Sequence, residues 1–114
     1  MITDKMRELV TTYIKDTLIN RGDVGLGGNT TSPAATTLDV GLGVNVTPSV
    51  VATSSNTFEV KLSIAGTASA ISGKVIREAS IQNTGNLLAR VNFDGIGPFA
   101  SNETLELFFI IEVE

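Results

Sequence analysis

The residues of this chain that could do chemistry are mostly carboxylates, and their spacing does not gather them into a site. Asp23, Asp39 and Asp94 each lie close to a glycine, where calcium ligands often occur, but no EF-hand loop or calcium-binding nonapeptide repeat surrounds them. We therefore expect these three to be turn residues. Glu106 and Glu112 take outward positions on an expected strand, where solvated charges belong, so no carboxylate pair for acid–base catalysis is predicted.

The amino-acid composition removes several other kinds of catalytic chemistry. The chain has no Cys and no His, so it lacks thiols, disulfides, the usual general base and the commonest metal ligand. The glycine-rich run at 23–28 follows an expected helix rather than a strand. It also lacks the Gly-Lys-Ser/Thr ending of a phosphate-binding loop, which favours a flexible connection. We expect a protein that is not an enzyme and holds no cofactor or metal.

Charge and hydropathy narrow the range of partners. The net charge of −4 argues against binding to a phosphate backbone. No apolar run approaches the length of a membrane span, and the N-terminal segment lacks the apolar core of a signal peptide. We therefore expect neither nucleic acid nor a membrane as partner, and synthesis and use without secretion in a reducing cytosol.

Residues 3–20 are predicted to form one amphipathic helix. Thr3 suits the N-cap, Asp4 suits the first turn, and Gly22 follows as a stop signal. The apolar residues recur at spacings of three and four and form one stripe: Met6, Leu9, Val10, Tyr13, Ile14 and Leu18. The sequence leaves open whether this stripe packs on the sheet of its own chain or on a neighbouring subunit.

The segment 21–37 is rich in Gly and Thr, has no hydrophobic period, and is predicted to be a loop. It contains the first copy of a short internal repeat. Residues 23–29 and 39–45 share the pattern Asp-Val-Gly-Leu-Gly-x-Asn. Two copies do not make a solenoid, so the pattern itself favours chance or a local duplication.

Strict alternation of apolar and polar residues predicts strands at 38–46, 57–65 and 103–114. A hairpin is predicted at 74–93, with a three-residue turn in which Gly85 takes the left-handed third position. Odd-numbered residues then face the core on both arms of the hairpin.

The hairpin register also places two charges. Glu78 is predicted to lie directly opposite Arg90 on the outer face, as a structural ion pair. This role argues against either residue as a catalytic or ligand-binding group.

Together these elements indicate a mainly β fold, an antiparallel β-sandwich with one N-terminal amphipathic helix. The chain has the length of a single domain, 1–114. Its expected parts are a helix at 3–20, a Gly/Thr-rich loop at 21–37 and a β-sandwich at 38–114.

Four apolar residues are candidates for an interaction surface. Phe108 and Ile110 point away from the inward residues of the closing strand, which favours a central strand covered on both faces by the helix or by a neighbouring subunit. Leu26 lies in the glycine-rich loop. Phe99 lies in a Gly-Pro-Phe connection, where it could stack on a sugar or anchor the loop to the core.

Several segments resemble small virion structural proteins of tailed bacteriophages. The likeness is carried by residues 77–81, by residues 85–93 with their Gly-x-Leu-Leu-Ala-Arg-x-x-Phe pattern, and by the closing strand at 103–114. The Gly/Thr/Pro/Ala loop at 25–38 is similar to the loop that such proteins carry after an N-terminal helix. The pattern most resembles a domain of tail-fibre or baseplate-associated proteins and of short stand-alone virion proteins.

The resemblance implies a non-enzymatic virion component, made in the host cytoplasm. Such a protein would pack onto the tail or fibre attachment region or the virion surface, with other virion proteins as partners and as a homo-oligomer. Capsid decoration, in which the protein cements the head shell, is the alternative. A carbohydrate-binding β-sandwich is a second alternative that the residues leave open, with Phe99 as its candidate aromatic.

Overall fold

The computed structural model shows a helical N-terminal segment followed by six strands. Thr30 and Pro33, two positions of the predicted 21–37 loop, lie outside the described residues, and the structure describes the rest of the chain. In chain order the described elements are α1 (Asp4–Tyr13), η1 (Ile14–Leu18), β1 (Arg21–Gly25), β2 (Ser49–Ala52), β3 (Thr57–Ala65), β4 (Ile76–Asn83), β5 (Asn86–Ile96) and β6 (Thr104–Glu112).

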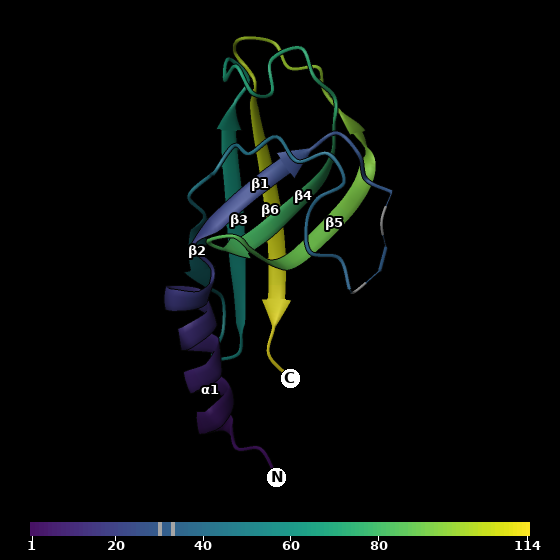
Figure 1. Cartoon of the computed structure of the whole chain (residues 1–114). Coiled ribbons are helices and arrows are strands. Elements are labelled where there is room, and N and C mark those ends of the chain that lie inside the picture. The colour runs from purple at the N-terminus through teal and green to yellow at the C-terminus, as the bar shows by residue number, and fades with distance from the viewer. Residues whose placement is uncertain (30, 33) are drawn as a thin grey trace.

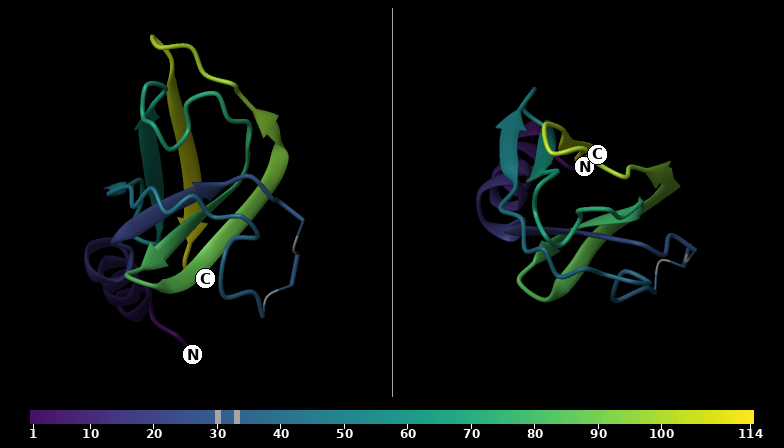
Figure 2. Two further views of the ribbon diagram at one scale, coloured as in Figure 1. Left: turned by 45° about the horizontal axis from the view of Figure 1, so that its top comes forward. Right: turned by 90° about the horizontal axis from the view of Figure 1, so that it is seen from above.

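The strands form two antiparallel three-stranded sheets, ordered β1-β4-β5 and β2-β3-β6 (Figure 1). The sheets pack on one another, and their strands cross at a steep angle in the view of Figure 1. This arrangement confirms the predicted mainly β antiparallel sandwich with one N-terminal helix. The helix extends from one end of the sandwich, beside the sheet that contains β2 (Figures 1 and 2).

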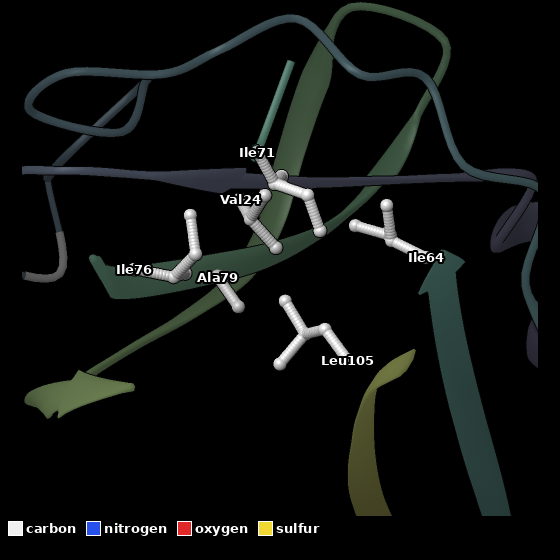
Figure 3. Packing of buried hydrophobic residues seen from close by; sticks show 6 residues of the cluster. All are labelled: Val24, Ile64, Ile71, Ile76, Ala79 and Leu105. Carbon is white, nitrogen blue, oxygen red and sulfur yellow. The ribbon is translucent and has the colours of Figure 1, made fainter. Parts of the chain in front are cut away.

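The core between the sheets contains two apolar clusters. The first combines residues of both sheets with one from the β3–β4 connection: Val24, Ile64, Ile71, Ile76, Ala79 and Leu105 (Figure 3). The second contains Ile19, Phe58, Val60 and Ile81, with Ile14 packed against it. Because Ile19 directly follows η1, the second cluster anchors the C-terminal end of the helical segment.

The predicted helix is confirmed at its start but has a different end. Thr3 is the N-cap, and its hydroxyl accepts the N–H of Met6 at 3.3 Å. α-Helical structure ends at Tyr13, and the π-helical turn η1 follows, in which the N–H of Ile19 donates to the carbonyl of Ile14 at 3.1 Å. Gly22 is not a stop signal, because it lies inside β1.

The predicted loop at 21–37 is wrong over its first five residues, which form β1 and pair antiparallel with β4. Glycines made this segment resemble a loop, but close packing requires them. A Cβ on Gly22 would lie 2.4 Å from the side chain of Leu62, and a Cβ on Gly25 would lie 2.5 Å from the carboxylate of Glu78. Tertiary packing therefore overrides the low strand propensity of glycine.

The segment 38–46 is not the regular strand that its alternation predicted. Gly43 and Asn45 have positive φ angles of 65° and 55°, which are incompatible with extended backbone. The alternation holds only in part, because Leu38 is buried whereas Val40 is exposed. The segment instead runs beside β1 as an irregular, partly paired stretch.

The two copies of the short internal repeat pair with each other in the structure. The two copies of the Asp-Val-Gly-Leu-Gly pattern lie side by side and antiparallel, with the first glycine of each copy opposite the other. The N–H groups of Leu26 and Leu42 donate to the carbonyls of Val40 and Val24, each at 3.0 Å. Equivalent positions of the two copies therefore make equivalent hydrogen bonds, as if the copies were related by a local two-fold axis.

The remaining strands differ in how well alternation predicted them. β3 has the predicted bounds, and its inward residues Phe58, Val60 and Leu62 are completely buried. β6 is an edge strand of its sheet, so the expectation of a central strand covered on both faces is wrong. Phe108 and Ile110 on its outer face are 54% and 73% exposed.

The β4–β5 hairpin forms with a shorter turn than predicted. Asn83 pairs with Asn86, which leaves two turn residues, and Thr84 rather than Gly85 has the positive φ of 52°. The reason lies outside the hairpin. The N–H of Thr84 donates to the side-chain oxygen of Asn20 at 2.7 Å, so the chain after the helix holds the turn in this shape.

The shorter turn changes the hairpin register. Irregularities lie between Ile81 and Gln82 and between Ile76 and Glu78. As a result Arg90 lies opposite Ser80, and Glu78 lies opposite Asn92 rather than opposite Arg90 as predicted.

We predict that Gly22→Ala lowers the free energy of unfolding by about 1–3 kcal/mol, because the added Cβ overpacks the core. Leu62 is completely buried, so any shift of its side chain would disturb the residues packed around it. Urea unfolding of the purified chain measures the change.

Gly85→Ala is the matched control for Gly22→Ala. A Cβ at Gly85 would meet nothing within 4 Å, so the free energy of unfolding should stay within about 0.5 kcal/mol of wild type. Equal stability of the two variants would show that β1 does not approach Leu62 as described.

Candidate functional site

The carboxylate of Glu78 is completely buried on β4 and is the centre of a hydrogen-bond network. One oxygen accepts the N–H groups of Gly27 and Val40 at 2.9 and 2.8 Å. The other oxygen accepts the N–H of Asp39 at 2.8 Å. One donor lies before residues 28–38 and the other two follow them, so Glu78 fixes both ends of that segment to the sheet.

Arg90 on β5 completes this buried network. Its guanidinium lies 3.0 Å from the Glu78 carboxylate and 3.3 Å from Asp39, and its side chain is 10% exposed. It also donates to the carbonyl of Thr37 at 2.9 Å and to the side-chain oxygen of Asn92 at 2.8 Å. Glu78 and Arg90 therefore form an ion pair, but across a diagonal of the hairpin rather than between directly opposed positions.

The network sets the protonation of Glu78. Burial alone would raise the pKa of this carboxyl, because it disfavours the charged form. Backbone N–H groups of Val40, Gly27, Asp39 and Gly28 oppose burial, and the net effect lowers the pKa below its ordinary value of 4.5. Glu78 is therefore ionised at neutral pH and its lone pairs are already occupied.

Asp23 on β1 likewise accepts backbone N–H groups, from the later part of the β1–β2 connection. Its carboxylate is buried and accepts the N–H groups of Gly43 and Val44 at 3.1 and 2.9 Å, and that of Val24 at 2.8 Å. Gly43 is the first residue of the backbone kink at 43–45. The backbone hydrogen bonds to β1 are interrupted there, between those of Leu42 and Val46. The carboxylate thus satisfies N–H groups that a regular strand would have paired.

The carboxylates considered from the sequence do not gather into a reactive centre. Asp23 and Glu78 are committed to backbone donors, and Glu106 forms a surface pair with Lys61 at 3.6 Å. Among the described residues, no group of three or more His, Cys, Asp or Glu side chains is arranged to hold a metal ion.

The first candidate interaction surface is the outer face of the β2-β3-β6 sheet. Phe108 and Ile110 are alternate residues of β6 and project from this face, on which each lies beside a charged residue of β3, Lys61 and Glu59 respectively. Val51 on β2 is exposed on the same face, one strand further on. We name the outward side chains of Val51, Phe108 and Ile110 the sheet patch.

The other two candidate interface residues are placed differently. Leu26 and Phe99 are partly buried, and both pack against the first core cluster. Phe99 therefore anchors its loop to the core, which leaves a sugar site without the aromatic platform that the sequence offered. The structure brings Phe108 and Ile110 together and separates them from the other two.

The second apolar surface is the exposed side of α1, which was predicted as a stripe but not as a surface. Met6, Leu9 and Tyr13 are each more than half exposed, whereas Thr11 is only 3% exposed. The helix thus turns a polar residue towards the body and its apolar stripe away from it. Amphipathic spacing alone cannot reveal which way a helix faces, so this orientation could not be predicted from the residue pattern.

A groove runs between β5 and the chain around residue 31. Its volume is about 620 Å³, and the described residues that line it are Thr31, Ser32, Ala35, Leu87, Leu88, Ala89, Arg90, Val91 and Asn92. No aromatic side chain is among them, so the described lining has no platform on which a sugar ring could stack.

Comparisons of the chain with protein-family models, with curated proteins and with solved structures find no match. Over the described residues, none of the helical segments combines the length and the apolar character that crossing a bilayer requires.

We predict that Glu78→Gln lowers the free energy of unfolding by about 3–5 kcal/mol at neutral pH, because it removes the carboxylate nearest to the buried Arg90 charge and replaces an acceptor oxygen by a donor. Chemical unfolding at constant pH measures the loss. Glu106→Gln, which alters only a surface pair, should cost about 0–1 kcal/mol.

The pH dependence provides a separate test of the same carboxylate. Because the pKa of Glu78 is lowered in the folded state, the unfolded chain binds the proton more readily. Its contribution to stability is fully present above the unfolded value of 4.5 and is lost as the pH falls through the lower folded pKa. The stability gap between wild type and Glu78→Gln should therefore narrow below pH 4.5; a gap that widens on acidification would contradict the assignment.

Proposed function

We propose that this protein is a non-enzymatic structural component of a tailed-bacteriophage particle, which assembles by protein–protein packing at the tail or fibre attachment region. The observation that carries the proposal is the sheet patch. A flat sheet face that exposes Phe108 and Ile110 to water is unfavourable for an isolated chain and suits a protein that is covered on assembly.

The arrangement of the sheet patch supports an interface with another protein. Aromatic and aliphatic side chains at the centre of an interface contribute most of its binding energy, and charged groups suit its rim. Phe108 and Ile110 form such a centre, and Glu59, Lys61 and Glu106 border it. The charged border would fix the orientation of the partner more than it would add affinity.

The resemblance of the hairpin and the closing strand to virion proteins gives this surface its setting. β6, which carries Phe108 and Ile110, is the closing strand of that pattern. Repeated copies on a symmetric particle would multiply a weak contact through avidity, so a small patch would be sufficient for stable attachment. Capsid decoration uses the same chemistry at a different place on the particle.

The test is incorporation into particles. Phage lacking this chain would be complemented with wild type or with the double variant Phe108→Asn/Ile110→Asn, and the copies per purified particle would be counted by quantitative mass spectrometry. We expect the double variant to fall at least tenfold below wild type, because the apolar centre of the interface is lost.

Val40→Asn is the control, because Val40 is equally exposed but lies outside the sheet patch. It should be incorporated at the wild-type level. Absence of the wild-type chain from purified particles would refute the proposed function. Separate analysis of heads and tails would then distinguish tail attachment from capsid decoration in particles that contain it.

A further inference from the structure

The N-terminal helix exposes the side that an amphipathic helix ordinarily buries. Within α1, Arg7 and Thr11 lie on one face, four residues apart, and are its least exposed residues. The hydroxyl of Thr11 donates to the carbonyl of Arg7 at 2.7 Å, so this buried polar group is satisfied within the helix. Leu9 and Tyr13 on the opposite side are 59% and 57% exposed.

The body of the protein does little to stabilise α1 in this orientation. Contact with the sandwich is made by η1, which lies against β2 and sends Ile14 to the second core cluster. α1 itself has ten residues, and helices shorter than about 12–15 residues are marginal in water without packing. The exposed stripe is therefore the surface from which further stabilisation of α1 must come.

The spacing of the stripe suits another helix as its partner. Met6, Leu9 and Tyr13 are separated by three and four residues, and all three are exposed. Side chains with this a/d spacing can pack into the holes of a facing helix.

The charges of the helical segment are compatible with an identical copy as the partner, which carries the same apolar stripe. Lys5 pairs with Glu8 at 3.4 Å and Arg7 with Asp4 at 3.3 Å, and Lys15 pairs with its neighbour Asp16. The segment is therefore neutral, whereas the whole chain carries −4, all of it outside the helical segment. Two copies repel each other through the rest of their surface and meet without net repulsion at the helices.

We propose that copies of this chain associate through their α1 helices, with Met6, Leu9 and Tyr13 buried against the same residues of a second copy. The projection of the helix beyond one end of the sandwich allows this contact while the bodies stay apart (Figure 1). The inference deepens the proposed assembly role and rests on it for its biological setting. The contact itself uses a surface separate from the sheet patch.

The solution mass tests this contact. Light scattering of the purified chain should give at least twice the single-chain mass of 11.9 kDa. The double variant Met6→Gln/Leu9→Gln should give the single-chain mass. Glutamine has nearly the helix propensity of the residues that it replaces, so the loss would report the apolar contact rather than an unfolded helix. Thr12→Gln, at an exposed position off the stripe, should keep the wild-type mass.

Cross-linking gives a second reading that does not depend on a weakened helix. The chain has no Cys, so a single introduced cysteine reports proximity without background. Under mild oxidation, Leu9→Cys should form a covalent dimer in high yield and Thr12→Cys should not. A wild-type monomer at all concentrations, or equal cross-linking by both variants, would overturn the inference.

The two proposals fail in different ways. If the Met6→Gln/Leu9→Gln variant is monomeric but is still incorporated into particles, the helix contact is supported and attachment to the particle does not need it. Phe108→Asn/Ile110→Asn that keeps its oligomeric mass but is missing from particles would show that the sheet patch alone makes the attachment.

Discussion

The fold depends on a buried negative charge that serves as an acceptor for backbone N–H groups. Two stretches of the β1–β2 connection, residues 26–29 and 38–46, lie against the β1-β4-β5 sheet without forming regular strands. Several of their N–H groups are partly buried and need an acceptor. The carboxylate of Glu78 receives three of them and Asp23 receives three more, counting its own neighbour. Apolar side chains could fill this space but could not satisfy these donors.

Burying that charge is tolerated because the surroundings supply the solvation that water would have given. Backbone N–H donors lower the pKa of Glu78 in spite of its burial, and the Arg90 guanidinium pairs with its charge at 3.0 Å. Glycine contributes by its small size, because a Cβ on Gly25 would occupy the position of the carboxylate. Protein donors thus satisfy the Glu78 carboxylate, whereas the buried Nε of Arg90 has no hydrogen-bond partner among the residues that the structure describes. At the surface, α1 and β6 expose apolar side chains.

Those parts of the fold in which one physical rule dominates could be predicted from the sequence. β3 alternates without interruption, is buried on one face, and has the predicted bounds. The Thr3 cap is likewise a local interaction and forms as expected. The predicted strand at 38–46 fails because its alternation is real but its backbone is bent by Gly43 and Asn45 around the Asp23 carboxylate. No pattern of residue types within that segment encodes an acceptor that lies on another strand.

For the candidate surfaces, too, local features could be predicted from the sequence and long-range features could not. Alternation marked Phe108 and Ile110 as outward residues, and they are exposed, but the position of β6 at the sheet edge depends on strand order. Strand order is a long-range property that alternation does not contain. Phe99 and Leu26 have the same apolar character as the first two residues and pack inward, because loop geometry places them over the core.

The irregular segment at 38–46 also limits how far the sheet can grow. It occupies the outer side of β1, where a regular strand would otherwise offer its ladder to another chain. The kink at Gly43 and Asn45 leaves no straight row of free groups on its own outer side. Strand addition at this end of the sheet is therefore blocked by backbone shape, without the lysines or prolines that commonly protect sheet edges. Copies of this chain that meet at high concentration therefore cannot join through β1 into a continuous fibre.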